Sequence, residues 1–205
     1  SDLGTVTLES GTFAMGSNDM TLSGSLLSTA GTFTASNLVT FDGSDSKTIE
    51  SPSGAVFSGV TIAAGTKTLS GAMRAAGDIQ LSAGTLVMGS SDVTVSGSLL
   101  ASAGTFTASN LVTFDGSDSK TIESPSGAVF SGVTIAAGTK TLSGAMRVSG
   151  DLSVSAGTLA MGTENVTLSG SLATSGTITA SNLVTFDSTE SKTIETNSEI
   201  GRAHV

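Results

Sequence analysis

The 205-residue chain has no cysteine, tryptophan or tyrosine, and its single histidine, His204, is the penultimate residue. Without cysteine there are no disulfides, thiolate metal sites or cysteine nucleophiles, although this does not fix the compartment, since a secreted protein can also lack cysteine. Without tryptophan or tyrosine there is no large aromatic platform for a sugar ring. The sequence also lacks a GxSxG elbow, and serine has no usable histidine base, so we predict no enzyme and no catalytic residue.

Charged residues are scarce as well: 8 Lys plus Arg stand against 17 Asp plus Glu, for a formal net charge of -9. So acidic a chain offers no basic patch, and we expect no nucleic-acid partner. No apolar run approaches the ~20 residues of a membrane-spanning helix. The opening SDLGTVTLES has no Met, basic segment or apolar signal core, so we expect a piece of a longer protein. Evenly spread hydrophobic residues, 38% of the chain, favour a folded protein over disorder.

What the sequence does contain is a repeat. Residues 31–74 return letter for letter at 104–147, an offset of 73, and a third copy of this stretch opens at Gly176 after an offset of 72. With their flanks, the copies start near residues 11, 84 and 157. Positions that differ between copies stay apolar, as inward-facing strand positions should; the corresponding sets are Met20, Val93 and Val166; Leu22, Val95 and Leu168; and Phe33, Phe106 and Ile178.

Each copy consists of short segments, such as LVTFDG, VTIAAG and DVTVSG, in which apolar and small polar residues alternate. This period of two predicts β-strands. We predict an all-β fold, a parallel β-solenoid with about three coils of ~24 residues per repeat and about eight coils in total. Tandem β-sandwich domains are the alternative; short strands, the absence of linkers and the lack of tryptophan disfavour them. Pro52 and Pro125 fall in SPSG turns, where no ladder donor is needed.

The cadence GTLVMGSSDVTVSGSLLASAGTFTA, followed by NLVTF and SKTIE, resembles the coils of autotransporter passengers and filamentous-haemagglutinin-like adhesins of bacteria. The resemblance extends over residues 2–196. It implies an extracellular or cell-surface, non-enzymatic stalk, spacer or adhesin segment. Its partners would be the neighbouring coils of the full-length chain and a host surface, extracellular glycans or proteins. No catalytic, cofactor-binding or metal-binding residue carries over.

An acidic turn, FDGSDSKTIE, recurs in every copy. Its acids are Asp42, Asp45 and Glu50, then Asp115, Asp118 and Glu123, then Asp187, Glu190 and Glu195. Stacked acidic turns would offer oxygen ligands to Ca²⁺, but the EF-hand and GGxGxD patterns are absent. We interpret them as solvated turns whose charge Lys47 helps to offset, and predict neither metal nor cofactor. The drift of Gly43–Asp45 to Ser188–Glu190 in the third copy is typical of such a turn.

Two further functions stay open. Paired carboxylates can cleave glycosides, so a carbohydrate-binding or carbohydrate-active β-helix is the alternative, although near-identical copies favour a repeated surface over one active site. Threonine-rich strands such as TVTL and TFTA suggest an ice-binding array, which would require one flat, aligned row of threonines. Arg74 and Arg147, both in GAMR, are interpreted as surface residues.

The repeat breaks abruptly after Asn197 and Ser198. The last seven residues, EIGRAHV, resemble the in-frame translation of a sequencing adapter. We therefore predict one continuous solenoid over residues 1–198 and a non-native tail over 199–205, which places Arg202 and His204 outside the fold.

Overall fold

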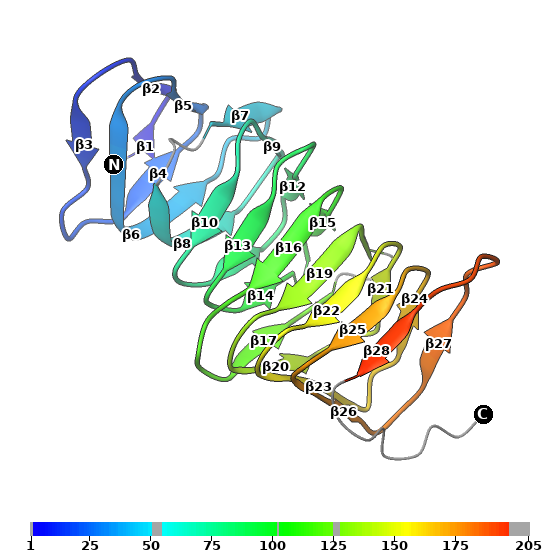
Figure 1. The fold of residues 1–205 in the computed structure, drawn as a ribbon. Coiled ribbons are helices and arrows are strands. Elements are labelled where there is room, and N and C mark those ends of the chain that lie inside the picture. The colour runs from blue at the N-terminus through cyan, green and yellow to red at the C-terminus, as the bar shows by residue number, and fades with distance from the viewer. Residues whose placement is uncertain (1, 51–54, 102, 125–127, 197–205) are drawn as a thin grey trace.

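The computed structural model describes residues 2–50, 55–101, 103–124 and 128–196. They form an all-β solenoid of about nine turns, whose two ends lie at opposite ends of its long axis (Figure 1). All strand pairs within the described ranges are parallel. The predicted parallel β-solenoid is therefore confirmed over tandem sandwiches, whose strands pair antiparallel. Pro52, Pro125, Arg202 and His204 lie outside the described residues.

Every coil contributes a strand to each of three faces, which the chain visits in the order first, second, third. The first face contains β1 (Asp2–Leu3), β4 (Met20–Leu22), β11 (Ile79–Leu81), β14 (Leu99–Leu100), β17 (Lys120–Ile122), β20 (Thr139–Leu142), β23 (Thr158–Gly162) and β26 (Thr177–Ala180). The second contains β2 (Val6–Leu8), β5 (Leu26–Ser28), β7 (Lys47–Ile49), β9 (Thr66–Leu69), β12 (Thr85–Val87), β15 (Thr105–Thr107), β18 (Val129–Phe130), β21 (Met146–Val148), β24 (Val166–Leu168) and β27 (Val184–Phe186).

The third face contains β3 (Thr12–Ala14), β10 (Met73–Ala75), β13 (Val93–Val95), β16 (Leu111–Phe114), β19 (Gly132–Ile135), β22 (Leu152–Val154), β25 (Leu172–Thr174) and β28 (Ile194–Thr196). Two longer strands, β6 (Thr32–Phe41) and β8 (Val56–Ile62), run round the corner from the third face to the first. They therefore join these two faces into one 18-stranded sheet.

The coil is shorter than the ~24 residues predicted. Atoms that hydrogen-bond between neighbouring coils are typically 19 to 23 residues apart in sequence, because a corner such as residues 76–78 takes only three residues. Three coils thus use about 60 residues, and a 73-residue copy advances about three and two-thirds coils. Met20 accordingly lies on the first face, whereas its counterpart Val93 lies on the third.

Glycine makes these tight corners possible because neighbouring coils touch there through their backbones. A Cβ added to Gly116 would overlap the carbonyl oxygen of Ser96, and one added to Gly150 would overlap that of Ser131. No side chain fits at either position unless the corner shifts. Ser188 replaces Gly116 in the third copy, so that turn cannot keep the same geometry, and the drift there is more than a change on a solvated loop.

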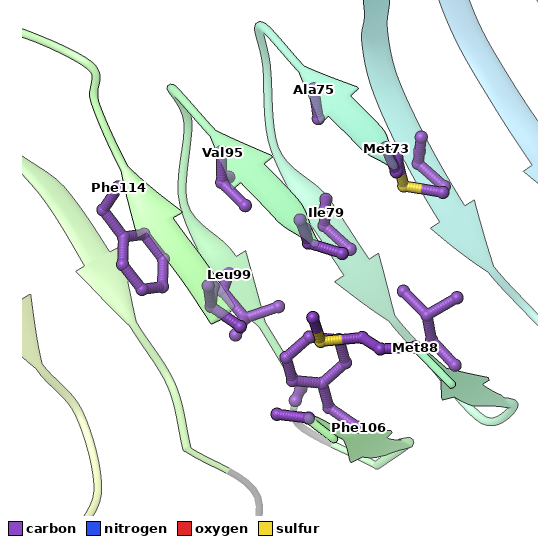
Figure 2. Packing of buried hydrophobic residues seen from close by; sticks show 14 of the residues in the cluster. Met73, Ala75, Ile79, Met88, Val95, Leu99, Phe106 and Phe114 are labelled. Carbon is purple, nitrogen blue, oxygen red and sulfur yellow. The ribbon is translucent and has the colours of Figure 1, made fainter. Parts of the chain in front are cut away.

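The interior is filled by columns of apolar side chains. One column on the third face consists of Met73, Val93, Val112, Val133, Leu152, Leu172 and Ile194. Figure 2 shows side chains from several coils, among them Val95, Phe106 and Phe114, gathered inside. The ring of Phe33 lies 5.8 Å from that of Phe13 and 5.7 Å from that of Phe57. The predicted inward positions are confirmed: all are buried except Ile178, which is partly buried.

Candidate functional surfaces

The recurring asparagine of the ASN segment binds the coil before it. The Nδ2 atom of Asn110 donates a hydrogen bond to the carbonyl oxygen of Ser90 at 2.8 Å. The same bond runs from Asn37 to Ser17 at 3.0 Å and from Asn182 to Thr163 at 2.7 Å. In all three copies this side chain therefore holds the turn of the preceding coil, which is a structural role.

Two lysines are fully buried, and sequence reasoning did not single them out. The Nζ atom of Lys140 donates to the carbonyl oxygens of Gly116 at 2.7 Å, Asp118 at 3.1 Å and Ala137 at 2.9 Å. Lys67 makes the same contacts in the copy before, to Gly43 at 2.7 Å, Asp45 at 3.4 Å and Ala64 at 2.8 Å. Each ammonium thus fastens the acidic turn to the following coil. The sequence did carry a sign of this burial: in TKTL, Lys140 stands two residues before Leu142, so the alternation of the strand points both side chains inward.

The pKa of both lysines is lowered. For Lys140 burial is the main cause, and the carboxylates of Asp115 and Asp118 oppose it. For Lys67 burial again comes first, followed by repulsion from Lys47, against Asp42 and Asp45. The carbonyl oxygens provide the compensating hydrogen bonds that a buried ammonium requires.

Arg74 and Asp115 are joined across two coil spacings through Ser96. The Arg74 Nη1 atom lies 2.6 Å from Asp115 Oδ2, and the Ser96 hydroxyl donates to Asp115 Oδ1 at 2.7 Å. Burial alone would raise the pKa of Asp115, but the hydrogen bond from Ser96 and the Arg74 guanidinium outweigh it and hold this pKa below its usual range. Arg74 lies at the surface, as interpreted from the sequence, with its side chain 45% exposed, and it also joins neighbouring coils.

The ladder recurs one copy later, with Arg147, Ser169 and Asp187. Arg147 Nη2 lies 2.7 Å from Asp187 Oδ2, and the Ser169 hydroxyl donates to Asp187 Oδ1 at 2.6 Å. The hydrogen bond from Ser169, then that from Arg147, lowers the pKa of Asp187. In the second and third acidic turns, one carboxylate, Asp115 or Asp187, therefore joins neighbouring coils.

The three acidic turns do not stack. Asp42 follows a strand of the first face, Asp115 one of the third and Asp187 one of the second, because each copy is displaced by two faces. Within the described ranges, no group of three or more Asp, Glu or His side chains is placed to hold a metal ion. Lys47 Nζ lies 3.5 Å from Asp45, as the predicted charge offset requires.

Threonines stack in short rows on all three faces. The pairings give Thr94, Thr113 and Thr134 on the third face, Thr66, Thr85 and Thr105 on the second, and Thr139, Thr158 and Thr177 on the first. The row on the third face continues with Ser153 and then Ala173. In the described part of the chain these rows change face with the repeat and do not form one long flat array.

Two shallow hollows occur at equivalent positions. One of about 370 Å³ is lined by Asn110, Leu111, Gly132 and Asp151, among others. The other, of about 410 Å³, is lined by their counterparts Asn37, Leu38, Gly59 and Asp78. Leu111 and Leu38 are exposed, at 38% and 37%, in a structure that otherwise buries most of its leucines. The hollows lie at different corners, between the second and third faces and between the third and first.

Within the described residues, no helix has the length and apolar character to cross a membrane. Comparison with protein-family models, with curated proteins and with solved structures finds no match to this chain. The chain is a repeat protein folded as a parallel β-solenoid.

Proposed function

We propose that this chain is a non-enzymatic shaft, a stalk or spacer segment of a large secreted or surface-displayed bacterial repeat protein. The observation that carries the proposal is the use of the repeated polar side chains. The asparagines, the buried lysines and the Arg–Ser–Asp ladders all bind one coil to the next. Duplication of such residues lengthens and stiffens a rod.

The mechanical consequence follows from the strand spacing. At ~4.8 Å per coil, one copy of about three and two-thirds coils adds about 18 Å of length. Side-chain hydrogen bonds and ion pairs at the corners join neighbouring coils, in addition to the backbone hydrogen bonds between their strands. A protein with more copies would therefore reach further from its anchor without a change in cross-section.

A specific observation favours an adhesive role beside the spacer role, namely the recurrence of the corner hollow. Asn110, Leu111 and Asp151 combine an amide, an exposed aliphatic group and a carboxylate around Gly132. Such a surface suits the hydroxyls and apolar ring faces of an extracellular glycan. Weak contacts repeated along the shaft would add up through multivalency.

The shaft proposal is tested by small-angle X-ray scattering on the chain and on a version with one further copy of residues 31–103 inserted after residue 103. We expect an increase in length of about 18 Å at constant cross-section. A compact particle, or a bend at the junction, would contradict it. Incubation with polysaccharides tests the enzymatic alternative. Release of new reducing ends would contradict the non-enzymatic shaft and favour a carbohydrate-active β-helix.

The adhesive role is tested separately on a glycan array. Leu38→Asp combined with Leu111→Asp should abolish binding, while Val87→Asp, at a partly buried position on the second face away from both hollows, serves as control. An array without any bound glycan would remove the adhesive role and leave the spacer role in place.

A further inference from the structure

One residue of the third copy introduces a chemical group that the other two copies lack at that position. Asn165 stands where the first two copies have Asp19 and Asp92, and the residue two positions further on is threonine in all three copies. The third copy therefore contains Asn165, Val166 and Thr167 in succession, the only Asn-x-Ser/Thr triplet in the chain. This triplet is the acceptor sequence for N-linked glycans when its middle residue is not proline.

The structure presents this triplet on the outside of the rod. Asn165 is exposed and lies at the corner between β23 on the first face and β24 on the second. Val166 is buried in the core and Thr167 is only partly buried, because side chains alternate between the two sides of a strand. Asn165 and Thr167, two residues apart, therefore lie on the same outer side, where one transferase can contact both.

The exposure belongs to this position in every copy. Asp19 and Asp92, the counterparts of Asn165, are exposed as well. The strand that follows Asp92, β13, is paired on both sides, with β10 and β16. The strand that follows Asn165, β24, is likewise paired on both sides, with β21 and β27. Neighbouring coils on either side thus leave the outer corner uncovered.

A hydrogen bond determines which atom of the Asn165 side chain is available. The backbone N–H of Leu183, in the following coil, donates to Asn165 Oδ1 at 3.3 Å. In the first copy the backbone N–H of Leu38 donates to Asp19 Oδ1 at 3.2 Å. The corner therefore needs one acceptor oxygen, which aspartate and asparagine both supply. Asn165 Nδ2 has no hydrogen-bond partner among the described residues, so this nitrogen is available while the oxygen keeps its bond.

We propose that Asn165 is an N-glycosylation site, at which a transferase attaches a sugar activated by a nucleotide-linked or lipid-linked diphosphate. Asn165 Nδ2 forms a bond to the anomeric carbon of the sugar and loses one proton to a base of the transferase. The bond between that carbon and the diphosphate oxygen breaks, and the diphosphate leaves. The amide carbonyl survives the reaction, so the N–H of Leu183 keeps its acceptor.

The attached glycan would stand clear of the two corner hollows. The hollows lie between the second and third faces and between the third and first, whereas Asn165 lies between the first and second. Modification and adhesion can therefore occur on the same rod. A glycan is bulky and hydrophilic, so it would add a solubilising group to one corner of the shaft.

The experiment has two arms, which separate the two donors. In one, the purified, folded chain is incubated with an N-glycosyltransferase and nucleotide-activated glucose. In the other, the full chain is exported from bacteria that contain an oligosaccharyltransferase specific for Asn-x-Ser/Thr and its lipid-linked glycan. Intact-mass and peptide mass spectrometry should find a sugar on Asn165 in at least one arm, and the arm that gives it identifies the donor. A short acceptor peptide in each arm verifies that the transferase is active.

The repeat supplies matched variants. Asn165→Asp restores the side chain of the first two copies, so it should keep the fold and lose the sugar completely. Thr167→Val keeps the amide but removes the hydroxyl that the acceptor sequence requires, and it should lose the sugar as well. Asp92→Asn creates the same triplet at the equivalent corner of the second copy and should gain a second sugar.

Far-UV circular dichroism verifies that each variant keeps the fold. A parent chain without sugar in both arms, while the acceptor peptide is glycosylated, would overturn the proposal. A sugar that persists in Asn165→Asp would overturn it too. Neither readout depends on the length of the particle, so either failure leaves the shaft proposal to its own scattering test.

Discussion

The buried lysines offer the sharpest test of how the coils are held together. Replacing Lys140 by methionine keeps most of the side-chain volume but removes the ammonium that three carbonyl oxygens share. Each acceptor left without a donor costs ~1–3 kcal/mol. The cost of burying the charge, which the lowered pKa of Lys140 reflects, disappears at the same time and offsets several kcal/mol.

We expect a net loss of ~2–4 kcal/mol in the free energy of unfolding, since water entering the turn can satisfy some of the carbonyls. At ~2–4 °C per kcal/mol for a chain of this size, Tm falls by ~5–15 °C. The assay is thermal and urea unfolding followed by far-UV circular dichroism, with amide exchange at residues 115–119 as the local readout. Lys120→Met is the control, because Lys120 is the register neighbour of Lys140 and is not buried.

The pH dependence gives an independent readout of the same site. The pKa of Lys140 is lower in the folded chain than the ~10.4 of an unfolded one, so the unfolded chain binds more protons between these two values. The free energy of unfolding of the parent therefore rises with pH in that window relative to Lys140→Met. The chain has no tyrosine or cysteine to obscure the titration. Unchanged Tm and unchanged exchange in the variant would refute the reasoning.

Three further outcomes are expected. Gly116→Ala should lower Tm sharply or prevent folding, because its Cβ has no room beneath the preceding coil, whereas Gly132→Ala, whose Cβ would lie 3.5 Å from Leu111 Cδ1, should shift Tm little. The pKa of Asp115 is lowered in the folded chain, so its carboxylate stabilises the fold above pH ~3.9, and this contribution is lost as pH falls through the pKa of the folded state. In Arg74→Ala, an NMR titration should show the pKa of Asp115 rising. Phe114→Ala, at a fully buried position, should cost ~3–5 kcal/mol in urea unfolding, and a loss below ~1 kcal/mol would contradict the packing described.

The fold was predictable because strand alternation and repeat length are both written in the sequence. Val93 and Val95 alternate with threonine and point inward, as the period of two requires. The number of residues per coil was not predictable in the same way. It depends on how few residues a corner needs, and that depends on close backbone approaches between coils, such as that of Gly150 to Ser131 at the corner of residues 149–151, which no local pattern reveals.

The polar contacts were likewise predictable only in part from the sequence. The acidic turns were visible as a motif, but the partners of Asp115 lie 19 and 41 residues away in sequence. Only the coil length brings Ser96 and Arg74 to it. Lys140 could have been found from its parity with Leu142, had a charged residue been allowed at an inward position.

The displacement of each copy by two faces has a consequence for how such a chain can change over generations. The segment LVTF occurs at 38–41 on the first face, at 111–114 on the third and at 183–186 on the second. The same segment can therefore form a strand on any of the three faces of the rod. Gain or loss of one whole copy moves everything beyond it along by about 18 Å and turns it by a third of a revolution, with no strand left on an unsuitable side. The number of copies can therefore change without disrupting the solenoid. Each change alters the length of the rod and rotates any segment beyond it about the rod axis.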